Sequence, residues 1–243
     1  MKTRIVPILA CLIAVIGAAV PASADSYDAV SDFSSTLNSS ATRWSYRYAA
    51  GTVRNGSYSL LPNYGSMGVY SPPDPGLWNT GAQIPLVGVN QSGGNVHLTI
   101  GPAFTWPNGT MLVHPGYGGL VVVSWLSPIT APVNISFSFS DLDPNGGDGI
   151  NWFVERNNSS STLGSGGFNN GGASGPQTLT GISVAAGDRI NFIVDPKAAP
   201  EYDSTQLTAT ITQVPEPSTV ALGLFALALC GLVLSRQRPS SYR

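Results

Sequence analysis

Short apolar runs recur along the central part of the chain, separated by segments rich in glycine, proline, asparagine and serine. In Val133–Phe139 apolar residues alternate with small polar ones, which is typical of a strand with one face on a core and one in water. Leu120–Trp125 begins with four consecutive apolar residues and predicts a central strand. Further segments of this character predict strands at Trp44–Ala49, Tyr58–Leu61, Val96–Ile100, Met111–His114, Ile150–Glu155, Gln177–Ile182, Arg189–Val194 and Gln206–Thr212.

The same pattern predicts the fold class. No long segment carries the 3.6-residue period of an amphipathic helix, so an all-β domain is expected. Eight to ten short strands without helices favour a single β-sandwich of jelly-roll type over residues 25–213. Trp44, Trp125 and Trp152 lie in predicted strands and are expected in its core. Asn157–Gly175 is rich in asparagine, serine and glycine and predicts a long flexible loop.

Charge and cysteine content narrow the possible functions. Residues 25–213 hold six Lys or Arg against twelve Asp or Glu, a net charge of −6. An acidic domain without a basic stripe is a poor nucleic-acid binder. The two cysteines, Cys11 and Cys230, both lie in apolar end segments. The domain is therefore expected to fold without a disulfide.

The N-terminus has the three parts of a secretory signal peptide. Lys2 and Arg4 precede the apolar stretch Ile5–Val20, and an Ala-x-Ala site ends at Ala24 before Asp25. Cleavage by signal peptidase is expected after residue 24. The alternatives are an uncleaved anchor helix, for which the run is short, and a lipoprotein signal at Cys11, which too few residues precede.

The C-terminus carries a second ordered pattern. Pro215-Glu216-Pro217 is followed by the apolar run Val220–Leu234 and then by Arg236 and Arg238. Residues 218–235 are long enough for a membrane helix, and the arginines after it indicate a cytoplasmic end with the domain outside. A plain tail anchor would share the helix and the charges.

These three parts in order resemble the PEP-CTERM sorting signal of Gram-negative bacteria. The resemblance covers residues 214–238 and implies recognition and processing by an exosortase, in species that produce exopolysaccharide. Together with the signal-peptide and strand patterns, it divides the chain into a signal peptide at residues 1–24, the β-sandwich at 25–213 and the sorting tail at 214–243. The implied localisation is an inner-membrane-anchored precursor, followed by the cell surface or extracellular matrix.

Most of residues 32–212 also resembles a β-sandwich domain of exported bacterial proteins that is common in planctomycete-like genomes. This resemblance supports the fold and implies no activity. It also extends to carbohydrate-binding modules at the level of fold. The residues that carry it are Asp32-Phe33-Ser34, Trp44-Ser45-Tyr46, His114-Pro115-Gly116, Val123-Ser124-Trp125, Phe139-Ser140-Asp141-Leu142-Asp143, Ala186–Phe192 and Asp203-Ser204-Thr205.

An acidic, glycine-rich loop follows Val133–Phe139. Asp141, Asp143, Asn145 and Asp148 have the spacing of oxygen ligands around Ca²⁺, although the loop departs from the EF-hand pattern. The same residue types form ordinary turns, and the turn is the favoured interpretation. A structural calcium ion is the one cofactor considered, and Asp195 or Asp203 are also placed to contribute to it.

Three aromatic residues lie outside the clear strands. Trp78, Trp106 and Tyr117 occur in Pro/Gly-rich stretches, where exposed rings would stack on sugars, although packing under loops is the favoured alternative for the tryptophans. No clustered catalytic motif occurs, and no catalytic residue is assigned. We therefore expect a non-enzymatic structural or adhesive protein that binds exopolysaccharide. The alternative is a secreted hydrolase that acts on matrix polysaccharide.

Overall fold

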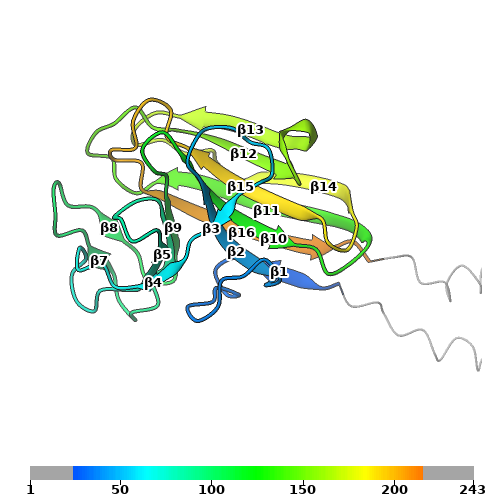
Figure 1. Ribbon diagram of the computed structural model, residues 1–243, viewed down its shortest axis with the longest axis horizontal. Helices are drawn as coiled ribbons and strands as arrows, with labels where there is room; N and C mark the ends of the chain where they lie inside the picture. The colour runs from blue at the N-terminus through cyan, green and yellow to red at the C-terminus, as the bar shows by residue number, and fades with distance from the viewer. Residues whose placement is uncertain (1–23, 216–243) are drawn as a thin grey trace, which may run out of the picture. The chain divides into compact units, whose positions relative to one another are not determined.

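Two antiparallel β-sheets, drawn in Figure 1, make up most of the computed structural model, which describes residues 24–215. A single 3₁₀ turn, η1 at Ser159–Ser161, is the one helical element among these residues. The strands form one unit, Ser26–Gln213. The predicted all-β class is confirmed.

The first sheet has eight strands. Its order is β14-β11-β16-β9-β6-β5-β4, and β1 pairs with the far end of β16. The bounds are β1 Ser26–Asp28, β4 Asn63–Gly65, β5 Leu77–Asn79, β6 Leu86–Val89, β9 Met111–His114, β11 Ala131–Asp141, β14 Gln177–Val184 and β16 Thr205–Gln213.

The second sheet has six strands in the order β13-β12-β15-β10-β2-β3. A separate hairpin, β7–β8, lies beside the first sheet (Figure 1). The bounds are β2 Trp44–Ala49, β3 Ser59–Leu60, β7 Val96–His97, β8 Thr105–Trp106, β10 Leu120–Leu126, β12 Ile150–Arg156, β13 Thr162–Phe168 and β15 Arg189–Asp195.

The connections are of the jelly-roll type. From β9 to β12, each strand passes to the opposite sheet, and β14, β15 and β16 do the same. Since sequential strands face each other across the core, their inward side chains meet. The predicted β-sandwich is confirmed.

The main core lies between the two sheets. Inward residues of β11 alternate with exposed ones, so Val133, Ile135, Phe137 and Phe139 are buried. The ring of Phe139 stacks on Trp152 of the opposite sheet, with centroids 5.6 Å apart. Burial of the strand tryptophans is confirmed, since Trp44, Trp125 and Trp152 are at most 6% exposed.

One predicted loop is wrong in part. The pattern of residues 157–175 predicts a flexible loop, but β13 occupies Thr162–Phe168 and pairs with β12 along its length. The sequence pattern does not predict this strand, because its glycines interrupt the alternation of apolar and polar residues. Gly166 stands where a Cβ would lie 2.6 Å from the Trp152 ring, so glycine lets this strand pass over a large side chain.

The first and last strands of the β unit place its two chain ends next to each other. Ser26 of β1 is paired with Thr212 of β16, so the chain enters and leaves side by side (Figure 1). Of the predicted end segments, Ala24, Asp25 and Pro215 lie within the described residues, outside any strand. The remainder of the signal peptide, Glu216, Pro217, the helix 218–235, Arg236 and Arg238 lie outside them. No helix in residues 24–215 has the length and apolar character needed to cross a bilayer.

Candidate functional site

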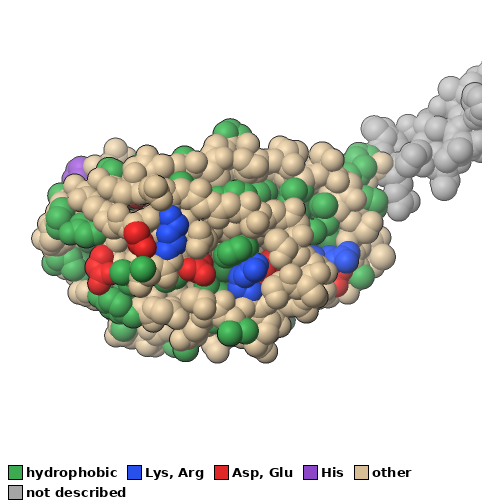
Figure 2. All heavy atoms as spheres, turned by 90° about the horizontal axis from the view of Figure 1, so that it is seen from above, with side chains coloured by type: hydrophobic (Ala, Val, Ile, Leu, Met, Phe, Trp, Pro, Cys, Tyr) green, Lys and Arg blue, Asp and Glu red, His purple; other side chains and the backbone are tan. Residues whose placement is uncertain are grey.

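A cleft of about 510 Å³ opens at the end of the sandwich that carries the β7–β8 hairpin. Its walls come from the hairpin, the start of β6, the end of β9, and the segments around residues 143 and 200–204. Its floor is shared with a second apolar core under the hairpin, which includes Tyr70, Leu86 and Phe104. Figure 2 shows apolar side chains gathered at this end of the molecule. The volume falls in the range of ligand clefts, about 300–1,000 Å³.

Two exposed apolar side chains stand among the cleft residues. Tyr117 is 72% exposed and Ile100 is 44% exposed. The Tyr117 hydroxyl is hydrogen-bonded to the Glu201 carboxylate, and this bond, with the negative charge, raises the pKa of Tyr117. The bond orients the ring without burying it, which leaves its face accessible to a ligand.

Both His114 and Asp143 contribute titratable side chains to the cleft. Burial lowers the pKa of His114 to about 4, so the imidazole is neutral at pH 7. Its Nδ1 lies 2.8 Å from the Pro115 carbonyl. Because a carbonyl can only accept, Nδ1 carries the proton and Nε2 is left as an acceptor. Burial also raises the pKa of Asp143, against hydrogen bonds from Asn145.

The two tryptophans proposed for sugar stacking do not fit that role. Trp78 is 7% exposed and Trp106 is fully buried. The Trp78 indole donates to the Ser34 carbonyl at 2.7 Å, and the Trp106 indole to the Thr110 carbonyl at 3.0 Å. Rings held inside the core by these bonds offer no face to a sugar. The hypothesis is kept for Tyr117 alone.

The four residues of the predicted calcium loop are engaged with different partners. Asp141 accepts from the Asp143 amide at 2.7 Å, and Asp143 accepts from the Asn145 side chain at 2.7 Å. Asp148 instead accepts from the Ala198 amide at 3.1 Å. Among the described residues, no three His, Cys, Asp or Glu side chains converge as metal ligands. A site on these four residues stays a prediction.

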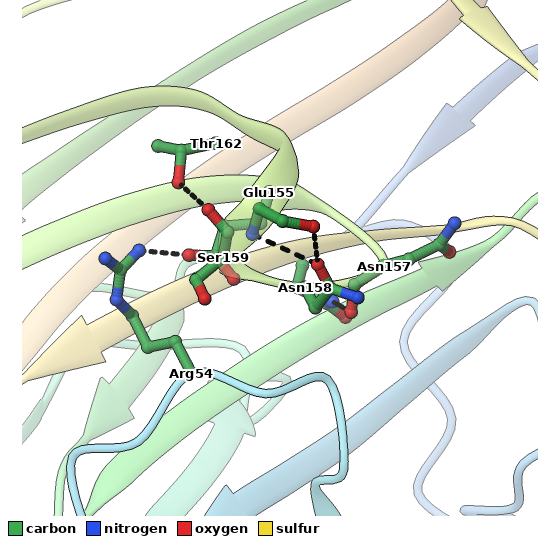
Figure 3. Close-up of polar contacts among 8 residues, drawn as sticks. Arg54, Glu155, Asn157, Asn158, Ser159 and Thr162 are labelled. Atoms are coloured by element: carbon green, nitrogen blue, oxygen red, sulfur yellow. Dashed lines mark hydrogen bonds and ion pairs between the residues drawn. The ribbon is translucent and has the colours of Figure 1, made fainter.

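Sequence reasoning missed a buried ion pair on the outer face of the second sheet. Arg54, from the loop after β2, pairs with Glu155 of β12, whose side chain is fully buried, as Figure 3 shows. The Arg54 guanidinium also lies 3.6 Å from the centroid of the Phe153 ring. The Ser159 amide donates to the Arg54 carbonyl at 3.0 Å and fixes the loop. The two residues are 101 positions apart in the sequence, and no local sequence pattern indicates that they form a pair.

Within residues 24–215, the fold and the cleft define a β-sandwich with an open, ligand-sized site. Comparison with protein families matches residues 213–238 to the family described as the PEP-CTERM protein-sorting motif. The PEP-CTERM resemblance of the tail is thereby confirmed. Comparison with curated protein sequences found no match.

Several solved structures share features of the fold at low similarity. The chain is 17% identical to the carbohydrate-binding module CBM36 in complex with calcium and xylotriose, with a TM-score of 0.25, covering 44% of this chain and 79% of that one. For a family 29 carbohydrate-binding module complexed with mannohexaose, the identity is 11%, the TM-score 0.28 and the coverage 71% and 92%. For the Podospora anserina GH26-CBM35 mannanase, the identity is 14%, the TM-score 0.29 and the coverage 54% and 28%. At these scores the likenesses carry no argument about function.

Proposed function

We propose that this chain is an exported, exosortase-processed protein of the cell surface or extracellular matrix. The main support is the PEP-CTERM motif at residues 213–238, at the C-terminal end of a chain whose N-terminus has the pattern of a signal peptide. Signal peptidase cuts after Ala24, residues 218–235 hold the precursor in the inner membrane, and the exosortase then processes the tail. The β unit belongs to the extracellular type that the planctomycete-like resemblance implies.

The β-sandwich binds polysaccharide in the cleft without acting on it chemically. The supporting observation is an open apolar cleft with the exposed Tyr117 ring among its residues. Sugar rings have apolar faces that pack on aromatic rings, and hydroxyls that need a few fixed polar partners. His114 Nε2 and the Glu201 carboxylate are acceptors suited to such hydroxyls.

The position of the cleft supports this proposal. Ser204 lines the cleft just before β16 begins, and the sorting tail follows where β16 ends. A strand of 9 residues spans roughly 30 Å. The cleft therefore lies at the end of the sandwich away from Gln213, so a polymer bound in it is clear of the residue to which the sorting tail is joined.

Removing residues 214–243 will move the protein almost completely from the cell-associated fraction into the medium. The fold will be retained, because the core lies within Ser26–Gln213. The measurement is fractionation with immunoblotting, with circular dichroism of the released form and mass spectrometry of the mature N-terminus, expected at Asp25. An exosortase-deficient strain is the control. Wild-type protein of unchanged full length in an exosortase-positive host would contradict the sorting proposal.

Replacing Tyr117 with alanine will weaken polysaccharide binding about fivefold. Loss of one ring contact costs on the order of 1 kcal/mol, and 1.4 kcal/mol corresponds to a factor of ten. The measurement is affinity electrophoresis against a panel of neutral and acidic polysaccharides. Leu37→Ala is the matched control, because Leu37 is 56% exposed but does not line the cleft. If no polysaccharide binds the wild type, or Leu37→Ala has the same effect, the cleft is not the binding site.

The hydrolase alternative has one observation in its favour. Asp143 and Glu201 both line the cleft, and glycoside hydrolysis needs two carboxylates at one sugar. Incubating the wild type with each polysaccharide that it binds tests this directly. If the wild type releases reducing ends and Asp143→Asn does not, the function is hydrolysis of the polysaccharide and not binding alone.

A further inference from the structure

The cleft beside the β7–β8 hairpin is lined by acidic side chains and by no basic ones. Asp143, from the acidic loop after β11, and Glu201, from the connection between β15 and β16, both line it. Among the described residues, no lysine or arginine belongs to the lining. In Figure 2 acidic side chains are visible toward this end of the molecule. A ligand that carries its own negative charge would therefore meet carboxylates without a compensating cation.

Electrostatic effects on neighbouring residues place the two carboxylates at different parts of the lining. The hydrogen bond to Glu201, followed by the Glu201 charge, raises the pKa of Tyr117. The same charge opposes the lowering of the His114 pKa by burial. In the floor of the cleft, burial raises the pKa of Tyr70, and nearby carboxylates that include Asp143 raise it further. A negative charge is thus close to the wall and to the floor of the cleft.

The wall that carries Glu201 is held in a fixed position. At Gly147, with φ of +88°, a Cβ would be 2.5 Å from the Glu201 carbonyl, so glycine permits this close approach of two backbones. Tyr202 has a φ of 69°, in the left-handed region, and a Cβ at Gly146 would lie 3.1 Å from its ring. The Glu201 side chain is in turn bonded to the Tyr117 hydroxyl. The carboxylate can therefore turn away from a ligand only by breaking that bond.

The cation in the same connection does not neutralise Glu201. The Lys197 ammonium donates to the carbonyls of Asp148 and Phe168 at 2.8 and 2.9 Å, and to Asn169 Oδ1 at 3.1 Å. An ammonium group has three donors, and these three bonds use them all. The acceptors of Lys197 do not line the cleft, so its charge is directed away from a ligand there.

The titratable side chains of the cleft favour a ligand that donates hydrogen bonds. His114 Nε2 is an acceptor, and the ionised carboxylates of Asp143 and Glu201 only accept. A sugar hydroxyl can donate to such groups, whereas the carboxylate of a uronic acid and the sulfate of a sulfated sugar only accept. An acidic group would lose water on entering the cleft and find no donor among these three side chains, which makes its burial strongly unfavourable.

We propose that the cleft selects uncharged polysaccharides and rejects acidic ones, such as polymers of uronic acids or of sulfated sugars. This inference rests on the proposed function, because it names the class of polysaccharide that the same cleft binds. Uncharged sugars supply hydroxyl donors to the acceptors of the cleft and an apolar face to the Tyr117 ring. The matrix partner is thus a neutral polymer, which binds without ionic attraction.

Pairs of polymers that differ in charge on the same backbone test the selection. Xyloglucan, glucomannan and pullulan are each compared with a derivative whose primary hydroxyls are oxidised to carboxylates, and alginate serves as a natural polyuronate. Isothermal titration of the full chain in detergent should give a Kd at least about tenfold higher for the oxidised form of each polymer that binds. Raising the NaCl concentration from about 0.01 M to about 1 M shortens the Debye length from about 30 Å to about 3 Å, so this difference should narrow.

A charge-removing variant and a matched control assign the selection to the cleft. Glu201→Gln removes the charge and keeps an oxygen that accepts from Tyr117. The ratio of the Kd values of the oxidised and uncharged polymers should fall at least about threefold in this variant. Asp188→Asn removes the same charge at the other end of the sandwich, because the next residue, Arg189, pairs with Leu126 at the far end of β10 from Tyr117. It should leave the ratio unchanged.

The outcomes separate this inference from the proposed function. If none of these polymers binds, the cleft is not a polysaccharide site, and both proposals are wrong. If an oxidised polymer or alginate binds as tightly as the uncharged polymers, polysaccharide binding stands and the selection is wrong. The selection is also wrong if Glu201→Gln changes the Kd ratio no more than Asp188→Asn does.

Discussion

Replacing Phe139 with alanine will lower the free energy of unfolding by about 3–5 kcal/mol, the usual cost of removing a buried aromatic ring. Phe139 is fully buried in β11. It stacks on Trp152 of the opposite sheet and lies edge-on to Phe137 at 6.0 Å. The truncation therefore opens a cavity at the point where the two sheets contact each other, and the rigid strands on both sides limit its collapse.

The measurements are urea unfolding and thermal unfolding of the full chain in detergent, both followed by tryptophan fluorescence. The expected shift of the melting temperature is about 6–20 °C downward for a domain of this size. Val53→Ala is the control, because Val53 is 69% exposed and should change the stability by less than about 0.5 kcal/mol. Equal effects of the two variants would show that the sheets do not pack through Phe139.

Replacing Arg54 with alanine will destabilise the protein by about 3–5 kcal/mol at pH 8, because it leaves the Glu155 carboxylate buried without its partner. The cost will be smaller at pH 5. Burial raises the pKa of Glu155, and the Arg54 charge opposes that increase. Without Arg54 the pKa of Glu155 in the folded state rises further above the value near 4.3 of the unfolded chain.

The sign of the pH effect follows from proton binding. Between the unfolded and the folded pKa of Glu155, the folded variant holds a proton that the unfolded chain has lost, so its stability falls as the pH rises through the folded pKa. Urea unfolding at pH 5 and pH 8 measures the difference. The double variant Arg54→Ala, Glu155→Gln removes the titrating group and should lose the extra pH dependence. A cost that is the same at both pH values in the single variant would refute the pairing.

The strands that alternation predicts are recognisable because their pattern is local. Trp44–Ala49 and Met111–His114 agree with β2 and β9 to the residue. The strands that alternation misses are short or rich in glycine, as in β5 and β13. A strand of two to four residues is too short to show a two-residue period. Glycine has no side chain, so it adds nothing to an alternating pattern.

The candidate site is much less predictable. The sequence identifies Tyr117 as a candidate aromatic, but it offers Trp78 and Trp106 as surface candidates on the same grounds, their Pro/Gly-rich surroundings. Those surroundings describe the backbone near a residue. They do not report that the β7–β8 hairpin folds over a second apolar core and buries the Trp106 ring.

The sequence by itself determined what rests on contiguous residues: the all-β class, most long strands and the sorting motif at residues 213–238. The tertiary structure alone decided which side chains meet. Arg54 reaches Glu155, segments from residue 69 to 204 line one cleft, and Asp203 loses its contact with water. The physical reason is that burial and charge proximity depend on contacts between distant segments, and these contacts exist only once the two sheets have packed.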